Sequence, residues 1–177
     1  MCDAFFMCRW ADNPTVNNTV MFSSTSDEWA TPQNLFDQLN AEFDFEIDLA
    51  ATAENTKCSS FYSLQLDSLS QHWGSRFDRG WLNPPYSRGV CRHFIEKAAR
   101  QRRMGFLTVM LLPSRTDTKA FHTHIYDAKM WQPREGVEIR FLPGRLKFGN
   151  AKNGAPFPSM IVIFRPDVEL KDGILAG

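Results

Sequence analysis

The first regular pattern along the chain is an apolar stripe that begins just after Thr31 and Pro32. Its members recur every three to four residues, which predicts a helix from about Pro32 to Glu42 with Thr31 as its N-cap and Pro32 at its first position. The stripe consists of Leu35, Phe36, Leu39 and Phe43. Apolar and acidic residues then alternate from Phe43 to Ala50, which predicts a strand with Asp48 at its carboxyl end.

Three later segments are almost purely apolar and predict buried strands. They are Trp81-Leu82, which stops at Asn83, and the runs 106–112 and 160–164. Continuous apolar runs are typical of strands that are covered on both faces in a parallel sheet. We expect all three segments to lie in one such sheet.

Weaker patterns fill the space between these strands. They predict a helix that Ser87 caps, a helix near 116–126, a strand near 137–142, and a loop over 143–158 that is rich in Gly, Pro, Asn and Lys. Strands that alternate with helices predict a doubly wound, Rossmann-like α/β fold. Ligands bind such folds at the carboxyl ends of the strands.

The length of 177 residues and a hydrophobic fraction of 43% predict one domain. Residues 1–26 show no sustained period and are expected to form an N-terminal arm before a domain over 27–177. The apolar runs are far shorter than the roughly 18 to 20 residues that span a bilayer, and the start does not resemble a signal peptide. We therefore expect a cytoplasmic protein without a membrane partner.

Charge is distributed unevenly although the formal net charge is zero. Residues 1–78 hold 3 Lys/Arg and 12 Asp/Glu, a balance of −9, whereas residues 79–177 hold 17 and 8, a balance of +9. Such asymmetry indicates a polyanionic partner for the basic part. Pairing of the two charge sets across the fold explains the same count.

The cysteine and histidine residues follow no metal-binding spacing. Cys2, Cys8, Cys58 and Cys91 form no CxxC pair, and the four His residues complete no zinc pattern. We expect neither a bound metal nor a disulfide framework.

A motif with specific chemistry follows the strand at Trp81-Leu82, and its sequence is Asn83-Pro84-Pro85-Tyr86. An exocyclic amine of adenine is a poor nucleophile because its lone pair is delocalised into the ring. Two acceptors aimed at the amine hydrogens favour a pyramidal nitrogen and stabilise the positive charge that develops on methyl transfer. The Asn83 amide oxygen and the Pro84 carbonyl are suited to this task, since two prolines stiffen the loop and cannot donate. Tyr86 offers a ring on which an extruded base can stack.

The chain resembles the amino-methyltransferases with a (D/N)PP(Y/F) motif, and more closely the small phage-type, Dam-like DNA N6-adenine methyltransferases. The resemblance runs from about Asp27 to Phe164. It includes Trp29-Ala30-Thr31-Pro32, the strand that ends in Asp48, a segment around Asp67, the NPPY loop, and the element from Gly144 to Phe148. The wider class usually has a glycine-rich F-x-G-x-G signature after its first strand, where this chain has Asp48-Leu49-Ala50-Ala51-Thr52.

The resemblance implies S-adenosyl-L-methionine as cofactor and double-stranded DNA as partner. It implies that Asp48 receives the methionine ammonium, that Thr31 contacts the carboxylate, and that Asp67 contacts the adenosine. The full expected cofactor set is Trp29, Thr31, Pro32, Asp48, Ala50, Asp67 and Asn83. The expected catalytic residues are Asn83, Pro84 and Tyr86.

The expected substrate contacts combine the end of the loop with basic residues: Pro85, Tyr86, Ser87, Arg115, Arg145 and Lys147. A DNA-contacting insert is expected within about 116–158, the segment outside the cofactor and catalytic elements. The implied function is site-specific methylation of a flipped adenine in duplex DNA by a phage or prophage protein in the bacterial cytoplasm. The bases recognised and the oligomeric state do not follow from the sequence.

Several alternatives stay open. Asp48 and Asp67 could each be a carboxylate that caps a loop, and an NPPY tetrapeptide can be a plain turn. The same loop suits an RNA or protein-glutamine methyltransferase, and a non-catalytic nucleic-acid-binding module could keep the nucleotide pocket. A nicotinamide oxidoreductase is disfavoured because no G-x-G-x-x-G follows a strand.

Overall fold

The structure of the protein is a computed structural model that describes residues 29–63, 65–75, 78–87, 89–149 and 151–167. The expected arm over 1–26 lies outside the described residues. No helix in the described ranges is long and apolar enough to cross a bilayer.

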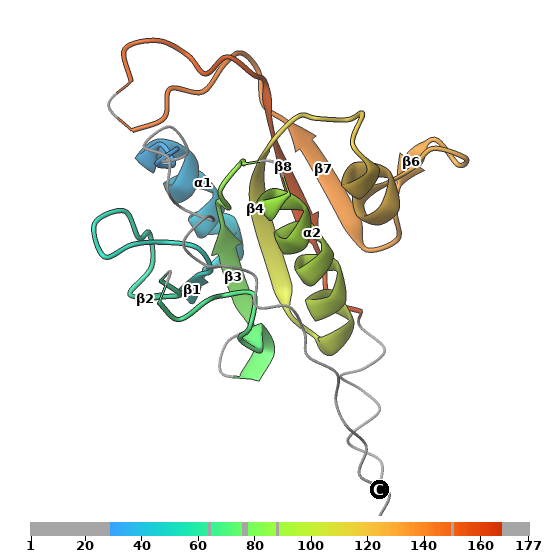
Figure 1. The fold of residues 1–177 in the computed structure, drawn as a ribbon, viewed down its shortest axis with the longest axis horizontal. Coiled ribbons are helices and arrows are strands. Elements are labelled where there is room, and N and C mark those ends of the chain that lie inside the picture. The colour runs from blue at the N-terminus through green and yellow to red at the C-terminus, as the bar shows by residue number, and fades with distance from the viewer. Residues whose placement is uncertain (1–28, 64, 76–77, 88, 150, 168–177) are drawn as a thin grey trace, which may run out of the picture.

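A six-stranded sheet in the order β2-β1-β3-β4-β8-β7 forms the centre of the molecule (Figure 1). The first four strands in this order are parallel, and β8 is antiparallel to both of its neighbours. The strands are β1 (Ile47–Asp48), β2 (Ser60–Phe61), β3 (Arg79–Leu82), β4 (Leu107–Pro113), β7 (Val137–Phe141) and β8 (Ser159–Phe164).

The strands predicted near 81, 106, 137 and 160 are thereby confirmed, but the parallel direction expected for the last of them is wrong. β8 follows β7 through a loop that contains no helix, so the chain turns back and pairs antiparallel. Its apolar run reflects burial of all six residues, which does not depend on direction. The strand expected over 43–50 is reduced to β1, because helix α1 (Gln33–Phe43) extends to Phe43 and ends on a left-handed Asp44.

The N-cap positions of the two main helices lie one and two residues after the predicted caps. Pro32 is the N-cap residue of α1 and Thr31 does not cap it; the helix α2 (Val90–Gln101) begins after Gly89, with φ of 96°, and Ser87 makes no side-chain cap. Both predicted helices are confirmed, and both predicted caps are wrong. Near 116–126 the chain forms the short helical segment η4 (Phe121–Ile125), followed by a hairpin of β5 (Tyr126–Asp127) and β6 (Gln132–Pro133).

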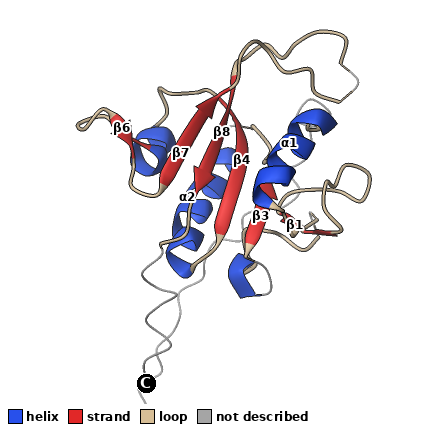
Figure 2. Ribbon diagram, turned by 180° about the vertical axis from the view of Figure 1, so that it is seen from behind, coloured by secondary structure: helices blue, strands red, loops and turns tan. Residues whose placement is uncertain are grey.

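The helices cover opposite faces of the sheet, as Figures 1 and 2 show from the two sides. On β4, Val109 and Leu111 pack in the cluster with the α1 residues, whereas Met110 and Leu112 pack in the cluster with the α2 residues. This alternation follows from the two-residue period of a strand. The protein therefore has the predicted Rossmann-like, doubly wound α/β fold.

Gly80 shows how tightly the strand before the loop is packed. A Cβ atom at this position would lie 2.7 Å from Leu49 Cδ1 and 2.9 Å from Phe106 Cζ. Only glycine therefore fits at position 80 of β3.

β7 lies inside the segment 116–158 and pairs with β8, so part of the expected insert belongs to the central sheet.

Candidate active site

The NPPY loop begins where β3 ends, at the carboxyl edge of the parallel strands. Pro84, Pro85 and Tyr86 are buried, and Asn83 is half-buried. The short segment η2 (Trp73–Ser75) precedes β3. The loop thus occupies the edge at which doubly wound folds bind ligands.

The side-chain amide of Asn83 is fixed by three contacts. Its Nδ2 donates to the Trp29 carbonyl over 2.5 Å and to Thr31 Oγ1 over 3.1 Å, while its Oδ1 accepts from the Tyr86 hydroxyl over 2.7 Å. A carbonyl can only accept, so the Trp29 contact determines which end of the amide carries the nitrogen. The structure therefore brings together four residues that the sequence placed in the site.

The Pro84 carbonyl forms no hydrogen bond with any described residue. Oδ1 of Asn83 has one lone pair left beside the Tyr86 hydroxyl. The loop thus presents two acceptors, which is the arrangement that the chemistry of an amine requires.

Tyr86 is packed inside the protein. Its side chain is 4% exposed, and its ring meets Phe148 and Phe157 edge to face at 6.2 and 5.7 Å. Burial raises the pKa of the phenol well above its usual value, so the hydroxyl is a proton donor. Its two acceptors are Asn83 Oδ1 and the Leu111 carbonyl, at 3.2 Å. Stacking of a base on Tyr86, as the sequence suggested, requires this ring to be uncovered first.

The loop between β7 and β8 supplies the cover. Phe148 is buried and packs on Trp29 as well as on Tyr86, and the Gly149 amide donates to the Ala30 carbonyl over 2.8 Å. Arg145 and Lys147, on either side of Leu146, point into solvent. Sequence reasoning missed Phe148 and Phe157 as site residues, although two aromatic residues in an otherwise polar loop were the available signal.

Asp48 is buried at the end of β1, beside β3. Its Oδ1 accepts from the Ala50 amide over 3.3 Å and its Oδ2 from the Lys57 amide over 3.1 Å. Burial raises its pKa to about 6, against the lowering effect of these hydrogen bonds. In the structure it caps a loop, as the alternative interpretation held, and no salt bridge engages it among the described residues.

Asp67 lies in the connection between β2 and η2, away from the Asn83 contacts. It has a positive φ of 42°, and its Oδ1 accepts from the Leu69 amide over 3.2 Å. The connection is attached to α2 by the buried Lys97, whose ammonium donates to the Leu69 carbonyl over 2.8 Å and to the Gln71 carbonyl. Burial lowers the pKa of Lys97 to about 8. Sequence reasoning did not identify Lys97 as a buried residue of α2.

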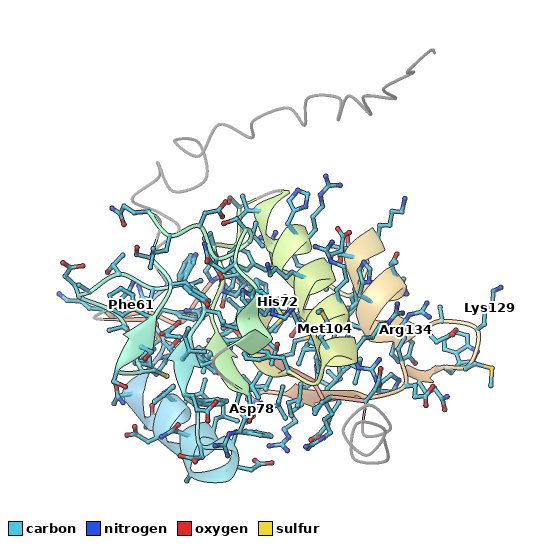
Figure 3. All side chains as sticks on the ribbon, turned by 90° about the horizontal axis from the view of Figure 1, so that it is seen from below. Phe61, His72, Asp78, Met104, Lys129 and Arg134 are labelled. Carbon is cyan, nitrogen blue, oxygen red and sulfur yellow. The ribbon has the colours of Figure 1, made fainter. Side chains whose placement is uncertain are left out.

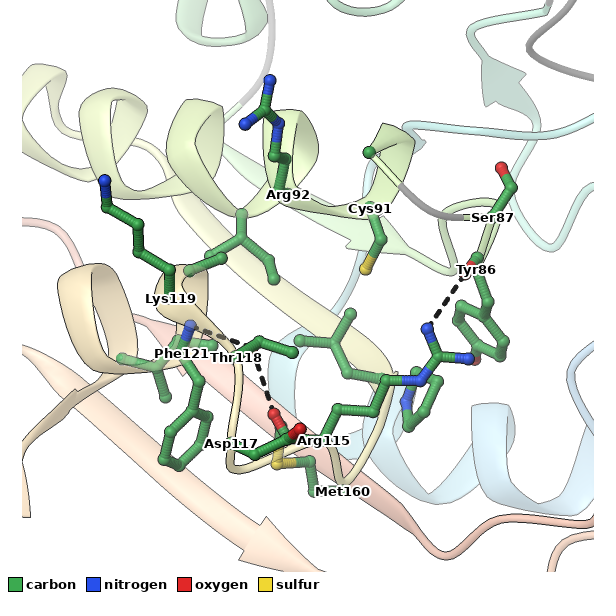
Figure 4. A pocket seen from close by; sticks show the side chains of 16 residues that line it. Tyr86, Ser87, Cys91, Arg92, Arg115, Asp117, Thr118, Lys119, Phe121 and Met160 are labelled. Atoms are coloured by element: carbon green, nitrogen blue, oxygen red, sulfur yellow. Dashed lines mark hydrogen bonds between the residues drawn. The ribbon is translucent and has the colours of Figure 1, made fainter.

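A pocket of about 350 Å³ lies on the α2 side of the loop (Figure 4). Its floor is apolar and includes Leu112, Phe121 and Met160, and its rim carries Arg92, Arg115 and Lys119. Arg115 Nη1 donates to the Tyr86 carbonyl over 3.4 Å. Ser87 lines the pocket, and its Oγ is buried without a hydrogen-bond partner.

Other side chains in the described ranges do not assemble into a metal site, because no three His, Cys, Asp or Glu residues converge there. Cys58 and Cys91 are free thiols, and Cys2 and Cys8 lie outside the described residues.

Comparison with known proteins shows that the chain is similar in sequence to DNA methyltransferases. A family model described as DNA N-6-adenine-methyltransferase (Dam) matches residues 18–174. A DNA N-6-adenine-methyltransferase of Escherichia phage T1 is 33% identical over 94% of this chain and 73% of its own length. One of Haemophilus phage HP1 is 32% identical over 81% of both chains. A solved structure from Thermoplasma acidophilum, described provisionally as a methyltransferase, covers 78% of this chain and 66% of its own with a TM-score of 0.41 and 9% identity.

The chain therefore belongs to the DNA N-6-adenine-methyltransferase (Dam) family.

Proposed function

We propose that the protein transfers a methyl group from S-adenosyl-L-methionine to the N6 amine of an adenine flipped out of duplex DNA. The observation that carries this proposal is the fixed Asn83 amide beside the unpaired Pro84 carbonyl, in a member of this family. Two acceptors in one loop, of which the Pro84 carbonyl has no donor among the described residues and Asn83 Oδ1 keeps one free lone pair beside the Tyr86 hydroxyl, suit an NH2 group that must become more nucleophilic.

The residues around β1 fit a cationic cofactor. A carboxylate that is buried without an ion pair is costly, and Asp48 forms no ion pair with a described residue, since the Lys57 ammonium donates to Gln33 instead; an ammonium group placed beside Asp48 would be stabilised. Thr31 and Trp29, both in contact with Asn83, would hold the cofactor next to the loop. Pro32 and Ala50 flank these positions, and Asp67 is assigned to the adenosine.

The cofactor supplies a methyl group made electrophilic by its sulfonium. During transfer a bond forms between N6 and the methyl carbon, the S–CH3 bond breaks, and its electron pair stays on sulfur. Asn83 Oδ1 and the Pro84 carbonyl accept hydrogen bonds from the two hydrogens on N6 and stabilise the positive charge on the nitrogen. One of these protons then leaves to solvent.

The pocket beside Tyr86 and Ser87 fits the extruded nucleotide. Its apolar floor suits a base, the unpaired Ser87 Oγ suits a polar ring edge, and the cations on its rim suit phosphates. Pro85 lies in the loop directly before Tyr86, which lines this pocket. Arg145 and Lys147 are exposed on the covering loop and would contact the DNA backbone. Both viral relatives are phage proteins, which supports action in the cytoplasm of a bacterial host.

The test is incubation with duplex DNA and methyl-labelled S-adenosyl-L-methionine, followed by nucleoside analysis. We expect N6-methyladenine from duplex DNA, and about 10² to 10³ times slower formation by Asn83→Ala at the same enzyme concentration. RNA and a mixture of unfolded proteins serve as competing substrates. Labelled RNA or glutamine, methylcytosine, or DNA binding without transfer at excess enzyme would each refute the proposal.

A further inference from the structure

The β5–β6 hairpin carries the most exposed aromatic side chain of the described residues. Trp131 is 81% exposed and Met130 is 66% exposed, both at the tip of the hairpin. Burial of a tryptophan is strongly favourable, so an exposed one at a protruding tip indicates a contact surface.

The tip has a defined shape although it is exposed. Asp127 Oδ1 accepts from the Lys129 and Met130 amides over 2.8 and 3.2 Å, and Trp131 adopts a positive φ of 55°. A left-handed conformation is unfavourable for a bulky residue, and such strain is typical of functional positions. The turn thus presents Met130 and Trp131 to solvent in a fixed arrangement.

The hairpin is also attached firmly to η4. Arg134 donates to the His122 carbonyl through Nη2 over 2.7 Å and through Nε over 3.2 Å, and its amide donates to the Ile125 carbonyl. Figure 3 shows Arg134 at the base of the hairpin and Lys129 at its far end. An extended rigid arm results.

Free positive charge lies at the end of α2, the helix that packs against η4. Arg100 and Arg103 are exposed, and their guanidiniums take part in no ion pair or hydrogen bond with a described residue. Burial is the main cause of the lowered pKa of His124 on η4; Glu96 opposes it, and Arg134, Arg100 and Arg103 lower the pKa further. α2 and η4 pack against each other on one face of the sheet (Figure 1). Arg100, Arg103 and the hairpin tip therefore belong to the same side of the molecule.

The charge of this side identifies its partner. Residues 92–134 hold 9 Lys/Arg and 3 Asp/Glu; without the buried Lys97 and Arg102, which pairs with Asp167, 7 Lys/Arg remain and the balance is +4, in a chain whose net charge is zero. Two copies of such a surface repel each other, whereas a polyanion is attracted to it. Arg92, Arg115 and Lys119 line the pocket, and Arg92 lies on the same helix as Arg100.

We propose that Arg100, Arg103 and the hairpin tip form a second contact with duplex DNA, beside the target adenine. This inference rests on the proposed function. The arginines contact phosphates, and Trp131 with Met130 packs against sugars and base edges in the adjoining groove. Because the contact lies outside the pocket, it contributes to DNA affinity and leaves the methyl-transfer step unchanged.

The test compares DNA binding with transfer for two variants. Each phosphate contact lowers the slope of log K against log salt by about 0.9, so Arg100→Ala/Arg103→Ala should reduce that slope by about 2. Trp131→Ala should weaken binding about tenfold or more, as expected for loss of an aromatic contact. The matched controls are Arg100→Lys/Arg103→Lys, which keeps the charge, and Trp131→Phe, which keeps a ring. Both should bind nearly as the wild type does.

The length of the DNA and the transfer rate complete the test. The losses should appear with a duplex of about 20 base pairs and vanish with one of about 8, too short for a helical turn of flanking DNA. The single-turnover rate at saturating DNA should be unchanged. Equal affinities for all variants on the long duplex, or a change of oligomeric state with Trp131→Ala in sedimentation, would overturn the second contact. A wild-type protein that methylates no DNA would overturn the proposed function instead.

Discussion

The Tyr86 hydroxyl donates a hydrogen bond of 2.7 Å to Oδ1 of Asn83, so the last residue of the loop orients the first. The phenol has one proton and a second acceptor in the Leu111 carbonyl. It can therefore turn to Leu111 when an amine hydrogen approaches Oδ1. We expect this contact to make Tyr86 a positioning residue, a role different from the stacking platform that the sequence suggested.

Tyr86→Phe separates these two roles because it removes the hydroxyl and keeps the ring. If the hydroxyl positions Asn83, the single-turnover transfer rate falls about tenfold, the scale of one hydrogen bond, and the dissociation constants of DNA and cofactor stay unchanged. If stacking alone matters, Tyr86→Phe behaves as the wild type. A mispaired target adenine serves as the control, since easier extrusion rescues a loss of stacking but not a loss of positioning.

Asn83→Ala should lower the transfer rate by about 10² to 10³, the scale of one preorganised transition-state partner. The measurement is a single-turnover assay with labelled cofactor at saturating DNA. Thr31→Val is the companion variant, because it removes one acceptor of the Asn83 Nδ2 and leaves Oδ1 in place. We expect a smaller loss for it. Equal turnover by Asn83→Ala and wild type would remove Asn83 from the chemistry.

Cofactor affinity should depend on the ionisation of Asp48. Burial raises the pKa of Asp48 from 3.8 to about 6 in the folded protein. The unliganded folded protein therefore binds this proton more tightly than the unfolded chain does, and it loses stability as the pH rises from about 4 to 6. Binding of an ammonium group favours the ionised form. Affinity should therefore increase about tenfold between about pH 5 and pH 7, the scale of a charge-assisted hydrogen bond.

Calorimetry at the two pH values measures this change. Asp48→Asn, which cannot ionise, should bind the cofactor weakly at both. The same variant should lack the decline in the free energy of unfolding over this range. A wild-type affinity as flat as that of Asp48→Asn would place the cofactor ammonium elsewhere.

Gly80→Ala should destabilise the fold by about 1 to 3 kcal/mol, the usual cost of overpacking, because a methyl group would overlap Leu49 and Phe106. Denaturant unfolding gives the difference. Gly144→Ala is the contrasting variant, since a Cβ there meets no atom within 4 Å and only the positive φ of 72° opposes it. Unfolding midpoints for Gly80→Ala at or above that of the wild type would show that β3 can move away from its neighbours.

The sequence predicted elements where burial leaves a local pattern. β4 and β8 were found because strands covered on both faces leave apolar runs, and α1 was found from its stripe. The direction of a strand relative to its neighbours leaves no such pattern in the sequence, so the antiparallel β8 was expected to be parallel. The N-cap predicted at Thr31 failed because its hydroxyl faces Asn83, a partner that is distant in sequence.

In the site, too, the local sequence predicted the position of the loop but not the contacts that distant segments make with it. The position of the Asn83 loop at the end of a strand was predicted from the apolar residues before it and is confirmed by β3, while its catalytic role stays a prediction. The burial of Tyr86 was not predicted, since it depends on Phe148 and Phe157 from a loop far along the chain. The burial of Lys97 was also not predicted. In the sequence it resembles the solvated cations of α2, and its burial depends on the β2–η2 connection that packs over it.

The position of β8 between β4 and β7 has a consequence for biosynthesis. As the chain leaves the ribosome, β7 emerges before the only strand with which it pairs in the central sheet of the described structure, and β4 has one edge unsatisfied until residues 159–164 arrive. Phe148 and Phe157, which cover the loop of Asn83, emerge only just ahead of that strand. The nascent protein therefore cannot become active in stages. Competence to methylate DNA should appear at once, when the C-terminal strand inserts, and shortening the chain before residue 159 should abolish it.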